Sequence, residues 1–243
     1  MPKEYSPAIN ADYPAADLIL NNPYSTLLFE HLEIKTVLQD KTITDVCTEN
    51  GISTALFLSL ARLFMQSHQM PKAHYTRHDV KNMIGYLKHC HSYYLDEKYP
   101  QIQLYIQELR DLNNTAEINL LEKFFNEYFQ EVKEHLDYEN KTVFPYISGL
   151  LEQLDEQPFV LHSDYSVSEY KAHHDNIEEK LSDIKNLIAK YLPVKNHPEI
   201  KRKLLFGLSE LEFDLHIHSE IEDLVLIPLV EQIEIEIRQR NEK

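Results

Sequence analysis

Histidine and glutamate recur in two copies of one pattern, H-x3-E-x5-P. The marked residues are His135, Glu139 and Pro145 in the first copy and His218, Glu222 and Pro228 in the second. All three positions are offset by 83 residues (218 − 135, 222 − 139, 228 − 145). Because residues i and i+4 share one face of an α-helix, about 6 Å apart along its axis, each His–Glu pair can point at one metal ion.

The same offset relates two further histidines, His91 and His174 (174 − 91 = 83). Each lies 44 residues before the histidine of one copy (135 − 91 and 218 − 174). That separation fits about 20 residues along one helix, a short turn and about 20 residues back, which returns the chain to the same height. We therefore predict a metal site built from four imidazoles and two carboxylates: His91, His135, Glu139, His174, His218 and Glu222.

Six nitrogen and oxygen donors without a thiolate suit iron or manganese, with zinc as an alternative. We expect two non-haem iron ions, each held by two histidines, with the glutamates as bridges. Positions would then remain for water, an oxo bridge, O2 or NO, as reactivity requires. A single histidine on a helix is more often structural or solvated, and H-x3-E alone is often a surface pair. The repetition at one offset is what favours a metal site.

Several neighbouring residues have a simpler interpretation. Pro145 and Pro228 would end or kink their helices. The histidines one or two residues from a predicted ligand face about 100–200° away on a helix and are candidates for a further imidazole or a second-sphere partner; they are His89, His173 and His216. Three tyrosines could line the site, although a tyrosine on a bundle helix more often packs in the core; they are Tyr93, Tyr94 and Tyr170.

Apolar residues at helical spacing predict an all-α protein. Four long helical patterns run over about residues 77–112, 115–151, 166–192 and 198–240, which predicts an up-down four-helix bundle in a domain of residues 77–243. Capping boxes are expected at Asn114 with Glu117 and at Ser166 with Glu169. Short amphipathic pieces predict a small helical N-terminal domain at residues 1–68, with Gly51 as a helix stop.

Composition narrows the functional classes. A net charge of −16 argues against nucleic acid or an anionic membrane as the partner. No apolar run approaches the roughly 20 residues of a membrane span, and no signal-peptide core is evident. The two cysteines, Cys47 and Cys90, lie far apart, so we expect no disulfide and a cytoplasmic location. No zincin, phosphate-loop or serine-hydrolase motif is present, and whether the protein is an enzyme stays open, as does its oligomeric state, a homodimer included.

The His–Glu constellation resembles the hemerythrin-like HHE cation-binding family, and within it the di-iron proteins that repair iron–sulfur clusters (the RIC family). The segment His89–Leu95 is similar to that family's HH-x-Y-L motif. The pieces ADLILNNP, LLFEHLEI and KTITDVCTENGI resemble the small domain that precedes the bundle there. The resemblance implies a hemerythrin-like fold with the six residues above as iron ligands. The family's adjacent cysteines are replaced by Val37 and Leu38, so a role that needs paired thiols is not implied.

Three functions follow from these patterns. The first is a di-iron protein of the nitrosative or oxidative stress response that handles NO or O2 or gives iron to a damaged iron–sulfur protein. The second is an O2 or NO carrier or sensor without turnover, which the absent cysteine pair favours. The third is a regulatory or scaffold bundle in which the metal only stabilises the fold.

Overall fold

The computed structural model describes residues 9–65, 75–113, 115–153, 165–173, 178–193 and 196–241. The chain divides into two compact units, residues 1–87 and 88–243. The division falls inside one continuous helix, α5 (Arg77–Ser92). The domain boundary predicted between residues 68 and 77 lies mostly outside the described residues and stays a prediction.

The first unit contains four short helices before α5, close to the predicted amphipathic pieces. They are α1 (Ala15–Asn21), α2 (Ser25–His31), α3 (Ile43–Asn50) and α4 (Thr54–Phe64). Helix α3 begins with a capping box between Thr42 and Asp45. It ends at Gly51, whose φ of 66° is the left-handed conformation that glycine adopts most easily. The predicted helix stop at Gly51 is therefore confirmed.

The described residues of the second unit form long helices, three of which contain a π-helical turn. The first is α5, η1 (Tyr93–Lys98) and α6 (Tyr99–Asn113). The second is α7 (Ala116–Tyr138), η2 (Glu139–Val143) and α8 (Phe144–Gln153). The third predicted helix comprises α9 (Val167–His173) and α10 (Glu178–Tyr191), on either side of residues that are not described. The last is α11 (Pro198–Ile221), η3 (Glu222–Leu226) and α12 (Ile227–Asn241).

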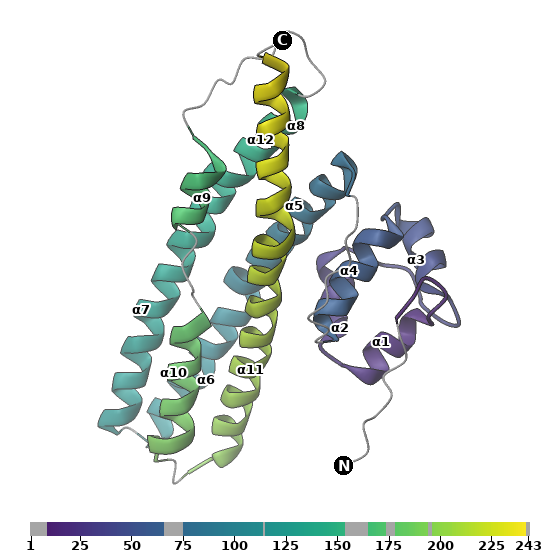
Figure 1. Cartoon of the computed structure of the whole chain (residues 1–243). Coiled ribbons are helices and arrows are strands. Elements are labelled where there is room, and N and C mark those ends of the chain that lie inside the picture. Colours follow the sequence, from purple (N-terminus) through teal and green to yellow (C-terminus); the bar gives the residue numbers. More distant parts are fainter. Residues whose placement is uncertain are drawn as a thin grey trace, which may run out of the picture. The chain divides into compact units, whose positions relative to one another are not determined.

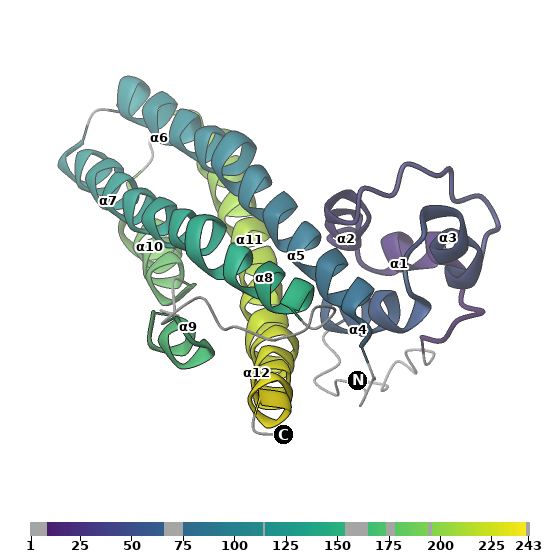
Figure 2. The same cartoon turned by 90° about the horizontal axis from the view of Figure 1, so that it is seen from above.

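Four helices of this unit close into a ring. Helix α6 packs against α7 and α11, and α10 packs against the same two helices, so that the four lie side by side (Figures 1 and 2). Towards the other end of the unit, α12 packs against α8 and α9. Leucines at helical spacing on α11, such as Leu204, Leu208, Leu211 and Leu215, are fully buried. The predicted all-α helical bundle is confirmed.

Two local details differ from the predictions or add to them. Helix α7 is capped by Thr115, whose hydroxyl accepts the N–H of Ile118, rather than by Asn114, which lies outside the described residues. At the start of α9, the N–H of Val167 donates to the carboxylate of Glu234 on α12 at 2.7 Å. That partner lies far away in sequence, so a local capping pattern could not reveal it.

Within the described part of the chain, no helix is both long and apolar enough to cross a bilayer. The same residues form no strand, and β-type pairing is limited to an isolated bridge between Pro14 and Thr42.

Candidate metal centre

Both glutamates of the repeated pattern stand at the first position of a π-helical turn. Glu139 begins η2 and Glu222 begins η3. The N–H of Phe144 donates to the carbonyl of Glu139, and the N–H of Ile227 donates to that of Glu222, each five residues back. π-turns inside α-helices occur mostly as single turns at functional sites. The repeat in sequence is therefore also a repeat in backbone conformation.

The prolines account for the position of these turns. Inside an α-helix, a proline ring meets the carbonyl four residues back. Phe144 and Ile227, whose N–H groups bond five residues back, come directly before Pro145 and Pro228. The extra residue in each π-turn therefore moves the carbonyl that the proline ring would otherwise meet. The prolines accordingly do not end their helices: α8 and α12 continue beyond them. The third π-turn, η1, precedes Pro100 in the same way. In all three cases an aromatic or aliphatic residue stands directly before the proline.

The centre of the site is a contact between three predicted ligands. The Nε2 atoms of His91 and His218 lie 2.9 Å apart, and Nε2 of His91 lies 3.2 Å from Oε2 of Glu139. Ligand atoms of these three residues all fall within 4.8 Å of one another. Two residues 127 positions apart in sequence, His91 and His218, thus meet in the interior of the second unit.

The other two predicted ligands that the structure describes, His135 and Glu222, extend this group on either side. Nε2 of His135 lies 3.2 Å from Oε1 of Glu139, so His91 and His135 reach the two oxygens of one carboxylate, at one height, as the 44-residue spacing predicts. Nδ1 of His218 lies 3.3 Å from Oε2 of Glu222. In both copies of the pattern the His and Glu four residues apart therefore point at each other.

These separations fit a metal ion. Nitrogen and oxygen ligands bind first-row metals at about 2.0–2.2 Å, so neighbouring ligand atoms on one ion stand roughly 3 Å apart. The distances of 2.9 Å and 3.2 Å among His91, Glu139 and His218 match that spacing. Moreover, within the described part of the chain, Nδ1 of His91 and both oxygens of Glu139 accept or donate no conventional hydrogen bond. Such orphaned buried atoms are costly unless a ligand satisfies them.

Burial makes the case for a cation stronger. Glu139 and Glu222 are fully buried, and His91 and His218 are 2% and 1% exposed. A buried carboxylate without a compensating positive charge is strongly unfavourable. Two such carboxylates, faced by imidazoles, form a donor set of the right charge and chemistry for a divalent or trivalent metal.

The two central histidines respond in opposite directions to this environment. Burial disfavours the charged imidazole and lowers the pKa of His91 below its ordinary value. Burial also opposes protonation of His218, but the carboxylate of Glu222, with Glu139 and Asp214 beyond it, outweighs this effect and raises the pKa of His218 to about 9. Metal binding at His218 therefore competes with a proton.

Aromatic side chains enclose the group. Phe144 stacks on His91 with ring centroids 5.5 Å apart, and Tyr94 meets the ring of His218 edge-on at 6.0 Å. The phenol of Tyr170 donates to Oε1 of Glu222 at 2.7 Å. Tyr94 and Tyr170 therefore line the site, whereas the phenol of Tyr93 donates away from it, to Glu210 at 2.6 Å.

The remaining predicted residues divide into two groups. His174, together with the side chain of His173, lies outside the described residues. His216, which also forms an H-x3-E pair, has a side chain 52% exposed and stands 3.7 Å from Glu220. The choice of His218 over His216 from the 83-residue offset thus agrees with their burial, and His89 is only partly buried.

One acidic residue near the site was not anticipated. Asp214 is 1% exposed, lies four residues before His218, and contributes to the raised pKa of that histidine. The sequence contains a signal for Asp214, because another acidic residue, Glu131, stands four residues before His135, at the same offset (214 − 131 = 83). Asp214 and Glu131 differ in burial, since Glu131 is exposed and forms an ion pair with Lys180.

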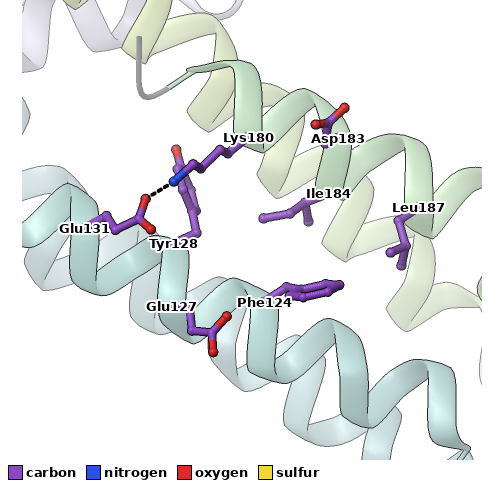
Figure 3. A pocket seen from close by; sticks show the side chains of 8 residues that line it. All are labelled: Phe124, Glu127, Tyr128, Glu131, Lys180, Asp183, Ile184 and Leu187. Atoms are coloured by element: carbon purple, nitrogen blue, oxygen red, sulfur yellow. Dashed lines mark hydrogen bonds and ion pairs between the residues drawn. The ribbon is translucent and has the colours of Figure 1, made fainter. Parts of the chain in front are cut away.

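Glu131 and Lys180 border a groove of about 300 Å³ between α7 and α10. Figure 3 shows Phe124 and Ile184 directed into the space between the two helices, with the ion pair of Lys180 and Glu131 at one end. None of the predicted metal ligands lines the groove. The candidate metal centre is thus a closed cluster of side chains and separate from this groove.

Comparison with known proteins agrees with this geometry. A search among curated protein sequences gives no match. The model of the hemerythrin HHE cation-binding domain matches residues 82–230, which include all six predicted ligands and more than half of the chain. Cation binding by that domain accords with the buried His91, Glu139 and His218. The chain belongs to the hemerythrin HHE cation-binding family.

Proposed function

We propose that this protein holds two iron ions in its second unit and uses them to handle NO or O2, in the response to nitrosative or oxidative stress or in the repair of iron–sulfur clusters. The observation that carries the proposal is the contact of His91 and His218 beside Glu139, at 2.9 Å and 3.2 Å, in a fully buried setting. The proposed ligand set is that of the sequence analysis, with His174 included and with manganese or zinc as alternative metals.

The chain's own residues would divide the work as follows. His91 and His135 bind from one side of Glu139, while His218 binds next to Glu222. When bound, the iron pair supplies one-electron redox changes and a binding position for a diatomic gas. Phe144 and Tyr94, packed on the two central imidazoles, would keep bulk water away from a metal held by those imidazoles. A small, uncharged gas suits such an enclosed site better than a large substrate does.

The test begins with protein purified without oxygen and loaded with ferrous iron. We expect about two irons per chain, an optical change on oxidation, and reaction of the diferrous form with NO or O2. His218→Ala should abolish iron uptake. His216→Ala is the matched control, because it removes an exposed histidine two residues away with the same spacing to a glutamate. Iron uptake that survives His218→Ala, or a diferrous protein inert towards both gases, would contradict the proposal.

A carrier or sensor without turnover is the second candidate, and the first unit favours it. Val37 occupies a position where the resemblance implies a cysteine, and it is 71% exposed. The two cysteines of the chain, Cys47 and Cys90, are buried and form no disulfide, and burial raises the pKa of Cys47 to about 11. A buried thiol with a raised pKa is a poor nucleophile.

An iron-transfer assay separates the two candidates. The iron-loaded protein is mixed with an apo iron–sulfur protein, and cluster formation is followed by its absorption. Transfer of iron selects the repair function. Reversible gas binding with all iron retained selects the carrier or sensor.

A further inference from the structure

The two buried glutamates of the candidate metal centre have different neighbours. The oxygens of Glu139 lie 3.2 Å from the imidazoles of His91 and His135, and no phenol or backbone N–H donates to them within the described part of the chain. Among the described residues, Glu222 faces the imidazole of His218 and also accepts the phenol hydrogen of Tyr170 at 2.7 Å. The sequence repeat makes the two glutamates equivalent, whereas their surroundings do not.

Tyr170 is a well-placed donor. Its side chain is 2% exposed, so water does not compete for the hydrogen bond to Glu222. A hydrogen bond to a buried carboxylate is about twice as strong as one between neutral groups.

The helix that carries Tyr170 is itself held in place by α12. The N–H of Val167 donates to Glu234 at 2.7 Å, and Lys171 binds Glu231 at 2.5 Å. Both acceptors belong to α12, the direct continuation of the π-turn that begins at Glu222. Tyr170 and Glu222 are therefore both held in place by α12.

The offset of 83 residues shows that this donor has no sequence counterpart. The position equivalent to Tyr170 is Leu87 (170 − 83), which has no polar atom in its side chain. The asymmetry is thus part of the sequence and does not depend on a rotamer at Glu139.

We propose that Tyr170 is a positioning residue for the metal centre: its phenol holds the carboxylate of Glu222 in one orientation, so that Glu222 binds metal preorganised. The inference rests on the proposed function only in requiring that the centre holds metal. Groups that hydrogen-bond to a metal ligand typically contribute about 10–100-fold to metal affinity. Tyr170 should contribute through Glu222 alone.

The experiment measures metal affinity, with zinc as a redox-silent probe competed against a chromophoric chelator. Tyr170→Phe should weaken zinc binding by about 10-fold or more, with the melting temperature of the metal-free protein reported alongside. The matched control is Tyr93→Phe, which removes a phenol that donates over a similar 2.6 Å to Glu210, a carboxylate outside the centre. This control should leave zinc affinity unchanged.

A double-mutant cycle assigns the effect to one glutamate. Tyr170→Phe should still weaken zinc binding in a Glu139→Gln background, and should have no further effect once Glu222→Gln has removed the carboxylate that it positions. An unchanged affinity in Tyr170→Phe, an equal loss in Tyr93→Phe, or the same effect in both glutamine backgrounds would overturn the inference. Wild-type protein that binds no metal would overturn the proposed function instead, and this inference with it.

Discussion

The two copies of the H-x3-E-x5-P pattern form the same backbone and different chemical environments. In each, a glutamate begins a π-turn that ends just before a proline, and the histidine four residues earlier points at that glutamate. Yet His218 contacts His91 and lies in a more acidic setting than His135, and only Glu222 has the described phenol donor. The repeat preserves the backbone conformation, which local sequence controls, whereas the residues that other helices place around each His–Glu pair differ.

Removal of a histidine should produce the largest difference between the copies. His218 touches both His91 and Glu222, whereas His135 lies at the edge of the group beside Glu139 and is more exposed. We expect His218→Ala to lower metal affinity by more than the roughly 100-fold typical of second-sphere losses, and His135→Ala to lower it less. Metal content and competition with a chelator measure both. Equal losses would mean that the two copies contribute equally.

Substitution of the prolines should affect the two copies alike. Alanine restores a backbone N–H and removes the ring, so that Pro145→Ala and Pro228→Ala each allow the preceding turn to return to α-helical bonding. One residue fewer in the turn rotates the glutamate by about 100° relative to the following helix. We expect metal affinity to fall about tenfold or more while helix content by circular dichroism is maintained. An effect in one copy alone would show that the π-turn matters only there.

The smallest effect concerns the metal-free protein. In that state Glu222 has a cationic neighbour, since the pKa of His218 is raised to about 9, and it also accepts the phenol of Tyr170. Glu139 faces His91, whose pKa is lowered. Glu139→Gln should therefore raise the free energy of unfolding, and Glu222→Gln should lower it, each by about 1–2 kcal/mol. Chemical denaturation at neutral pH, after metal is removed with a chelator, measures the difference, and a shift of the same sign in both variants would contradict it.

Much of the architecture followed from local patterns. The amphipathic spacing predicted the long helices and the short ones of the first unit, and Gly51 ended α3 as expected. The helices and the glycine stop succeed because helix periodicity and glycine conformation depend on neighbours in sequence. The offset of 83 residues favoured His218, which is buried, over His216, which is exposed, and this choice of ligand stays a prediction.

Other features could not be read from neighbours in sequence. The prolines predicted an end or a kink, but the structure accommodates each with a π-turn, because the helices continue to bury apolar residues beyond them. Asp214 and Glu131 share one offset and differ in burial. The groove between α7 and α10 likewise depends on how two distant helices pack.

The sequence by itself determined the donor types, their number on each helix and their common face, since these depend on residue identity and on 3.6 residues per turn. Tertiary structure alone decided that His91 meets His218, that Tyr170 reaches Glu222, and that the carboxylates of Glu139 and Glu222 are fully buried. Contacts between distant helices depend on packing angles and side-chain volumes summed over the whole core. A local pattern does not contain those quantities.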